Sequence, residues 1–196
     1  MSDEGLITFT GDGTQQRQVF NINMNTLEVE KSKLGIRQWS LAFNNIPDGQ
    51  PIIINLYGKN GMDWYPGWRI WVNGQDYSTP VGDRGAARDR FRSIASRIIW
   101  NLPNATGLTM HYAWFKEVDR NKSDGLLSNN TSNGVMFPGS ILIPRGGMEV
   151  NADTNGRLYV GKNLTLNIWE HHNIAWIGFN EPQCFAVNGS TKASLS

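Results

Sequence analysis

The chain has 196 residues and a formal net charge of +1, with 18 Lys and Arg against 17 Asp and Glu. This length fits one domain that buries a core without disulfides, and the near-neutral charge argues against nucleic acid as a partner. Charged residues are only 18% of the chain, while Asn and Gly each occur 21 times, a balance that favours an extracellular β-protein over a cytosolic enzyme.

Short runs of β-type residues recur along the first part of the chain, separated by turn residues. Several alternate apolar and polar side chains with a period of two residues, as strands buried on one face do. Asn73-Gly74 predicts a type I′ hairpin turn, because both central residues of that turn need a positive φ. The expected strands lie at 6–10, 18–22, 38–43, 51–57, 68–72 and 76–79.

Residues 84–100 differ, since their apolar residues recur at helical spacing. Phe91, Ile94, Ala95 and Ile98 follow the i, i+3, i+4, i+7 pattern of a helix with one buried side. We expect one short helix near 85–95, with the residues after it turning into a strand. The Arg residues of this segment fall mostly off the apolar stripe and indicate a solvated face.

After Pro103 the strand pattern resumes around a long polar loop at 119–134. Loops of that length in a compact domain are usually functional or disordered. Many short strands with Gly, Asn and Pro turns predict an all-β fold, an elongated β-sandwich or jelly roll of immunoglobulin-like type with the one helix. The later strands are expected at 109–115, 140–143, 157–160, 164–169, 174–179 and 184–187.

Three of the eight Trp fall within nine residues, in the stretch that begins at Asp63. A Pro-Gly pair interrupts this stretch, so we place Asp63, Trp64 and Tyr65 on a loop ahead of a strand, with the Trp64 ring exposed. A sugar site needs an aromatic face for the apolar side of the ring and polar side chains for its hydroxyls. We therefore expect a glycan to stack on Trp64 or Tyr65, with Asp63 and Asn60 binding its hydroxyls. Trp114 belongs to a second candidate set.

No catalytic or metal-binding spacing is found in the sequence. His111, His171 and His172 do not follow a zinc pattern, and adjacent His residues on a strand would point to opposite faces. The acidic residues show no spacing that selects a pair for glycoside hydrolysis. We expect no catalysis, no metal and no cofactor.

Two segments near the ends of the chain are similar to subunits of bacterial chaperone–usher fimbriae. Gly5-Leu6-Ile7-Thr8-Phe9-Thr10-Gly11 resembles their first strand. Pro182-Gln183-Cys184-Phe185-Ala186-Val187, followed by Lys192-Ala193-Ser194-Leu195, resembles the entry into a pilin domain. The resemblance implies the receptor-binding lectin domain of a fimbrial tip adhesin at 1–183, with 184–196 as the start of a pilin-like domain.

The same resemblance implies an extracellular location at a fimbrial tip, with other fimbrial subunits as partners. It also implies that Cys184 pairs inside a pilin domain; from the residues alone, a buried free thiol is the other reading of this single cysteine. Some adhesins of this kind use His-bound zinc, which keeps the three His open as ligands. The chain departs from the family by lacking the disulfide of most such lectin domains.

These features predict a cell-surface adhesin or lectin domain that binds a host glycan or glycoprotein without catalysis. No nucleic acid is expected as partner, and no membrane insertion, because no apolar run approaches the roughly 18 residues of a membrane span. Two other classes stay open: a receptor-binding or structural jelly-roll protein of a phage or virus, and a glycan-active enzyme.

Overall fold

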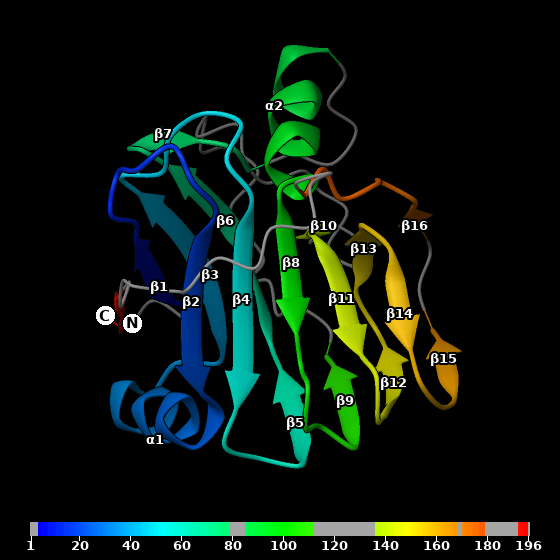
Figure 1. The fold of residues 1–196 in the computed structure, drawn as a ribbon. Coiled ribbons are helices and arrows are strands. Elements are labelled where there is room, and N and C mark those ends of the chain that lie inside the picture. The colour runs from blue at the N-terminus through cyan, green and yellow to red at the C-terminus, as the bar shows by residue number, and fades with distance from the viewer. Residues whose placement is uncertain (1–3, 79–84, 112–135, 168–169, 179–191, 196) are drawn as a thin grey trace, which may run out of the picture.

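The protein is a solenoid of parallel β-strands, in which most coils of the chain contribute one strand to each of three walls (Figure 1). The computed structural model describes residues 4–78, 85–111, 136–167, 170–178 and 192–195. Strand β4 (Ile52–Tyr57) leads into β5 (Gly61–Trp64) and then β6 (Pro66–Val72), and each belongs to a different sheet. The same sequence of walls repeats with β11 (Ser140–Ile143), β12 (Gly147–Val150) and β13 (Asp153–Asn155).

The first wall, called sheet B here, is five-stranded and entirely parallel in its pairing. Its order is β2 (Gln18–Asn23), β4, β8 (Ile98–Asn101), β11 and β14 (Leu158–Val160). The second wall, sheet C, is a four-stranded parallel sheet. Its order is β5, β9 (Gly107–Met110), β12 and β15 (Leu164–Leu166).

The third wall is divided between two sheets. One contains the parallel strands β1 (Glu4–Thr10), β3 (Gln38–Asn44) and β6, with β17 (Lys192–Leu195) antiparallel to β1 and β7 (Gln75–Asp76) antiparallel to β6. The other contains β10 (Met136–Pro138), β13 and β16 (His171–His172), again parallel.

Two helices interrupt the coils. Helix α1 (Met24–Leu34) lies between β2 and β3, and helix α2 (Ala86–Ala95) precedes β8 and projects from the solenoid (Figure 1). Asn23 caps α1 by accepting a hydrogen bond from the Asn25 N–H, and Gly35 ends it with φ 64°. Within the described part of the chain, neither helix is long and apolar enough to cross a membrane.

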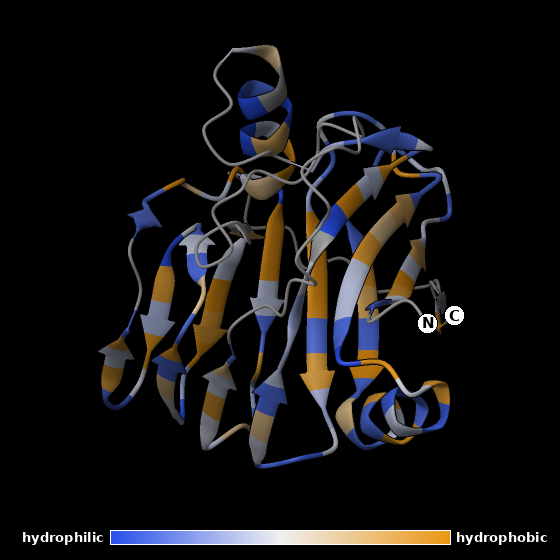
Figure 2. Cartoon of the chain, turned by 180° about the vertical axis from the view of Figure 1, so that it is seen from behind, coloured by the Kyte–Doolittle hydropathy of each residue, from blue (hydrophilic) through white to orange (hydrophobic). Residues whose placement is uncertain are grey.

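The core consists of apolar rows that run from coil to coil. Along sheet B, Phe20, Ile54, Trp100 and Ile141 are register partners, and all are buried. Seen from behind, the strands alternate hydrophobic and hydrophilic residues, which places one set inside (Figure 2). Burial of these side chains, at roughly 25 cal/mol per Å² of apolar surface, is the main force that stacks the coils.

Close stacking also requires glycine where neighbouring coils turn. Gly139 has φ 101°, and a Cβ at Gly156 would collide with the Gly139 backbone. A side chain at either position would push two coils apart.

The all-β expectation is confirmed, as is the helix near 85–95. The Asn73-Gly74 turn is confirmed too: both residues have positive φ, and Val72 pairs with Gln75. The expected sandwich or jelly roll is not found among the described sheets, because such folds pair antiparallel strands whereas the walls here are parallel. The loop at 119–134, and Cys184 with the boundary expected before it, lie outside the described residues.

Candidate functional site

The binding residues expected from the sequence lie around β5, at the edge of sheet C that faces α1. Asp63 and Trp64 belong to β5, Asn60 precedes it, and Tyr65 follows it. Trp114, the remaining candidate, lies outside the described residues.

Trp64 is part of the core, so the expectation of an exposed ring is wrong. Its side chain is 2% exposed, and its ring packs against Trp100, with 5.1 Å between ring centroids, and against Phe137 at 6.0 Å. The reason is the two-residue period of β5, which turns Met62 and Trp64 inward while Asp63 faces solvent. This Trp cannot stack on a sugar.

Tyr65 is half-buried, and both faces of its ring are occupied. The His111 ring lies parallel to it with a centroid separation of 4.2 Å, and the Lys31 ammonium lies 3.4 Å from the ring centroid. Two groups that close cannot share one face, so they cover opposite faces. Burial raises the pKa of Tyr65, and the nearby Asp63 and Glu28 carboxylates raise it further. Burial lowers the pKa of Lys31, while the same two carboxylates act in the opposite direction and raise it. The stack is a structural contact between α1, β5 and β9.

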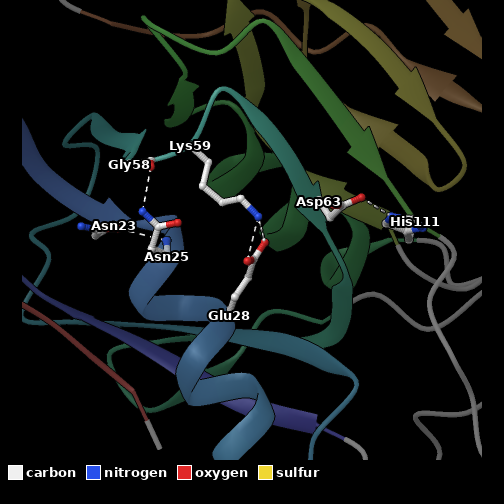
Figure 3. A network of polar contacts seen from close by, with 7 residues as sticks. All are labelled: Asn23, Asn25, Glu28, Gly58, Lys59, Asp63 and His111. Atoms are coloured by element: carbon white, nitrogen blue, oxygen red, sulfur yellow. Dashed lines mark hydrogen bonds and ion pairs between the residues drawn. The ribbon is translucent and has the colours of Figure 1, made fainter.

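Helix α1 is held to the turn before β5 by a polar network (Figure 3). Lys59 Nζ contacts both Glu28 carboxylate oxygens at 2.6 and 2.8 Å, and the Asn25 amide donates to the Gly58 carbonyl at 2.8 Å. The pocket between helix and strand is partly open to solvent and has a volume of about 30 Å³. That volume holds one or two water molecules.

The outer face of sheet C is polar, and its side chains largely bind one another. Asp63 Oδ1 lies 2.8 Å from His111 Nε2. Farther along the wall, the Asn167 amide donates to Asn151 Oδ1 at 3.1 Å and to Glu149 Oε1 at 3.3 Å. Asp63 and Glu149 are exposed, but each carboxylate already has a hydrogen-bonding partner among the neighbouring side chains.

The outer face of sheet B carries a row of asparagines that the sequence analysis did not single out. Asn21, Asn55 and Asn101 are register partners on adjacent strands. The Asn55 amide donates to Asn21 Oδ1 at 2.9 Å, and the Asn101 amide donates to Asn55 Oδ1 at 2.8 Å. We call these three residues the amide ladder.

The row of the amide ladder continues across the remaining strands of sheet B. Leu142 is the register partner of Asn101, and Tyr159 is the register partner of Leu142. Tyr159 is 44% exposed, as is Tyr57, which lies two residues beyond Asn55 on the same face of β4. The outward positions of the described sheet B strands hold amide, aliphatic, serine and tyrosine side chains and no charge. Exposed aromatic rings beside amides therefore occur on sheet B rather than around Trp64.

A signal for the amide ladder exists in the sequence. Residues 19–22, 53–56 and 99–102 read Val-Phe-Asn-Ile, Ile-Ile-Asn-Leu and Ile-Trp-Asn-Leu, which is one pattern three times. The ladder asparagines are separated by 34 and then 46 residues. The unequal spacing, caused by the helix and hairpin inserted between coils, conceals the repeat.

The three His residues do not converge. His111 contacts Asp63, His171 Nδ1 lies 2.8 Å from Thr154 Oγ1, and His172 Nδ1 lies 2.7 Å from Asn155 Oδ1. Among the residues that the structure describes, no group of three or more His, Cys, Asp or Glu side chains is placed to hold a metal ion.

Comparison with known proteins gives one family. The model of a family described as "Putative Ice-binding-like adhesive domain" matches residues 1–145, a span that contains α1 and the amide ladder. No curated protein and no solved structure matches the chain. The matched family is an adhesive one, in agreement with the expected adhesin role at that level, and it is not the chaperone–usher fimbrial lectin family that the end segments resemble.

Proposed function

Because the chain belongs to the ice-binding-like adhesive domain family, we propose that it is the adhesive domain of an extracellular surface protein and binds a host glycan without catalysis. The family supports the adhesive role. The glycan as ligand is supported by the chemistry of the outer face of sheet B.

The amide ladder is the observation that carries this proposal. A side-chain amide has two N–H donors and an oxygen with two lone pairs. Asn55 uses one donor on Asn21 and one lone pair for Asn101, so one of each is left for a ligand. Sugar hydroxyls both donate and accept, and they fit such paired groups.

Tyr57 and Tyr159 supply the aromatic part of the site. The exposed ring of each can lie against the apolar face of a sugar, the role first expected of Trp64 and Tyr65. A neutral hydrogen bond contributes about 0.5–1.5 kcal/mol net, so several amides and a stacked ring are needed together for useful affinity. Asn60 and Asp63 stay predicted hydroxyl partners on the neighbouring wall, where the described residues offer no uncovered aromatic ring next to them.

The test is a glycan array probed with the purified domain and two matched variants. Asn55→Ala removes the central amide of the ladder and should weaken binding about fivefold to tenfold, the effect of losing one or two hydrogen bonds. Asn167→Ala removes an amide from the amide–amide contact on sheet C and should leave binding unchanged. Chromatography of the bound glycan after incubation should show no cleavage products.

Two outcomes would contradict the proposal. One is an array on which the folded domain retains no glycan. The other is equal binding by the wild type and Asn55→Ala, with Asn167→Ala as the variant that loses it.

A further inference from the structure

The amide ladder runs across strands β2, β4 and β8, and these strands lie side by side along the axis of the solenoid (Figure 1). Its amides repeat once per strand, at a spacing of ~4.8 Å. From this geometry, and on the basis of the proposed function, we infer that the ligand is a linear, equatorially linked polysaccharide that lies along the solenoid axis with one sugar residue per strand.

Hydrogen bonds within the ladder fix the orientation of its amides before any ligand arrives. Asn101 donates to Asn55, and Asn55 donates to Asn21, so the amide planes follow one another in the same sense. Asn55 keeps one donor and one lone pair, Asn21 keeps a second donor as well, and Asn101 keeps a second lone pair, so each step offers at least one donor and one acceptor. A repeating surface of this kind favours a repeating ligand, because every unit of the ligand meets the same groups and little side-chain freedom is lost on binding.

The spacing separates a polysaccharide from an extended peptide. A peptide in β conformation repeats its same-side groups every ~6.7 Å, so it would move out of step with a ladder of ~4.8 Å by ~1.9 Å, or about two fifths of the ladder repeat, at each unit. A sugar residue in a flat, equatorially linked chain advances by a length close to the strand separation, and successive residues are turned over, so the same edge of the sugar recurs at every second strand. Because both edges carry hydrogen-bonding groups, such a glycan stays in step with consecutive amides, whereas a peptide does not.

The length of the row sets the length of chain that it binds. From Asn21 to Tyr159 the row crosses the five strands of sheet B, which makes four strand intervals or ~19 Å. Asn21, Asn55 and Asn101 provide polar contacts at one end, and Tyr159 provides a ring for stacking at the other. The row accommodates roughly four or five sugar residues at one per interval.

The test is a length series of β-1,4-linked N-acetylglucosamine and β-1,4-linked glucose, from mono- to hexasaccharide, measured by isothermal titration calorimetry. Affinity for at least one series should rise by about twofold to tenfold with each added residue. It should stop rising near the pentasaccharide. Asn55→Ala and Tyr159→Ala should each reduce the gain with length, while Asn167→Ala should keep it.

The outcomes separate this inference from the proposed function. If the array shows a bound glycan but affinity for neither series increases with length, the linear-chain inference is wrong and the glycan-binding proposal stands. If the array shows no glycan at all, both fail. A rise with length that survives Asn55→Ala and Tyr159→Ala together would also overturn the inference, provided that circular dichroism shows the variants folded.

Discussion

Sheets B and C are neighbouring walls of the same coils, yet their outer faces differ in chemistry. Sheet C carries carboxylates and a histidine that pair with each other, as in Asp63 with His111. Sheet B carries uncharged amides that keep donors and acceptors free, with exposed tyrosines on the same face. Under the proposed function, it is unused hydrogen-bonding capacity in a fixed geometry, and not polarity alone, that distinguishes sheet B from sheet C.

The aromatic residues sharpen the same contrast. Around sheet C they are inside, like Trp64, or covered on both faces, like Tyr65. On sheet B, Tyr57 and Tyr159 point outward. Trp64, which was expected at the surface, thus belongs to the core, while Tyr57 and Tyr159 lie at the surface.

The largest effect on stability is expected from removing the buried ring of Trp64, with the exposed ring of Tyr159 as the comparison. Trp64→Ala should lower the free energy of unfolding by about 3–5 kcal/mol, because it empties a packed site between Trp100 and Phe137. Tyr159→Ala should change it by no more than about 0.5 kcal/mol, since that ring lies at the surface. Urea unfolding followed by Trp fluorescence measures both. A Trp64→Ala protein that is as stable as the wild type but no longer binds glycan would show that the binding site lies at β5.

A smaller effect is expected from the charged pair on sheet C. Asp63→Asn removes the carboxylate from His111 and should cost at most about 1 kcal/mol of stability, because the pair is largely exposed. Glycan binding should weaken less in calorimetry than in Asn55→Ala, because Asn at position 63 keeps an oxygen acceptor for a sugar hydroxyl. A marked loss of binding with Asp63→Asn would show that the ligand extends over sheet C.

The smallest effect concerns pH. Burial, together with the neighbouring His172, lowers the pKa of His171 below its ordinary 6.5 in the folded protein. The unfolded chain therefore takes up more protons as the pH falls through 6.5, and the free energy of unfolding should decrease in that direction. His171→Asn should reduce this decrease, as measured by urea midpoints at about pH 8 and about pH 5, on either side of the ordinary His pKa.

Glycan binding should not follow this pH dependence, because the row along sheet B is built from amides, an aliphatic side chain and tyrosine. Calorimetry under conditions where the protein remains folded at both pH values provides the comparison. Loss of binding at the lower pH without loss of structure would place a titrating group in the binding site.

Local features of this fold could be predicted from sequence, because they depend on neighbours along the chain. The periodicity of Phe91, Ile94 and Ala95 predicted α2, and Asn73-Gly74 predicted its hairpin turn. Helix α1 was missed, because Met24 and Leu27 are its only buried residues and leave no clear apolar stripe.

The topology and the exposure of single rings could not be predicted in this way. Each strand pairs with one from another coil, and the inserts between coils vary in length, so strand spacing did not distinguish a solenoid from a sandwich. The inward direction of Trp64 depends on where β5 begins. Placing that residue on a loop, because of the Pro-Gly pair after it, removed the alternation that would have turned the ring inside.

The hydrogen bonds of the amide ladder also have a direction. Its donors all point from Asn101 toward Asn21, so the surface is not the same when followed in the opposite direction. A polysaccharide likewise has chemically different reducing and non-reducing ends. In the proposed binding mode the two ways of laying such a chain on sheet B differ in energy, so copies of the domain on a fibre of parallel chains would favour one direction along it.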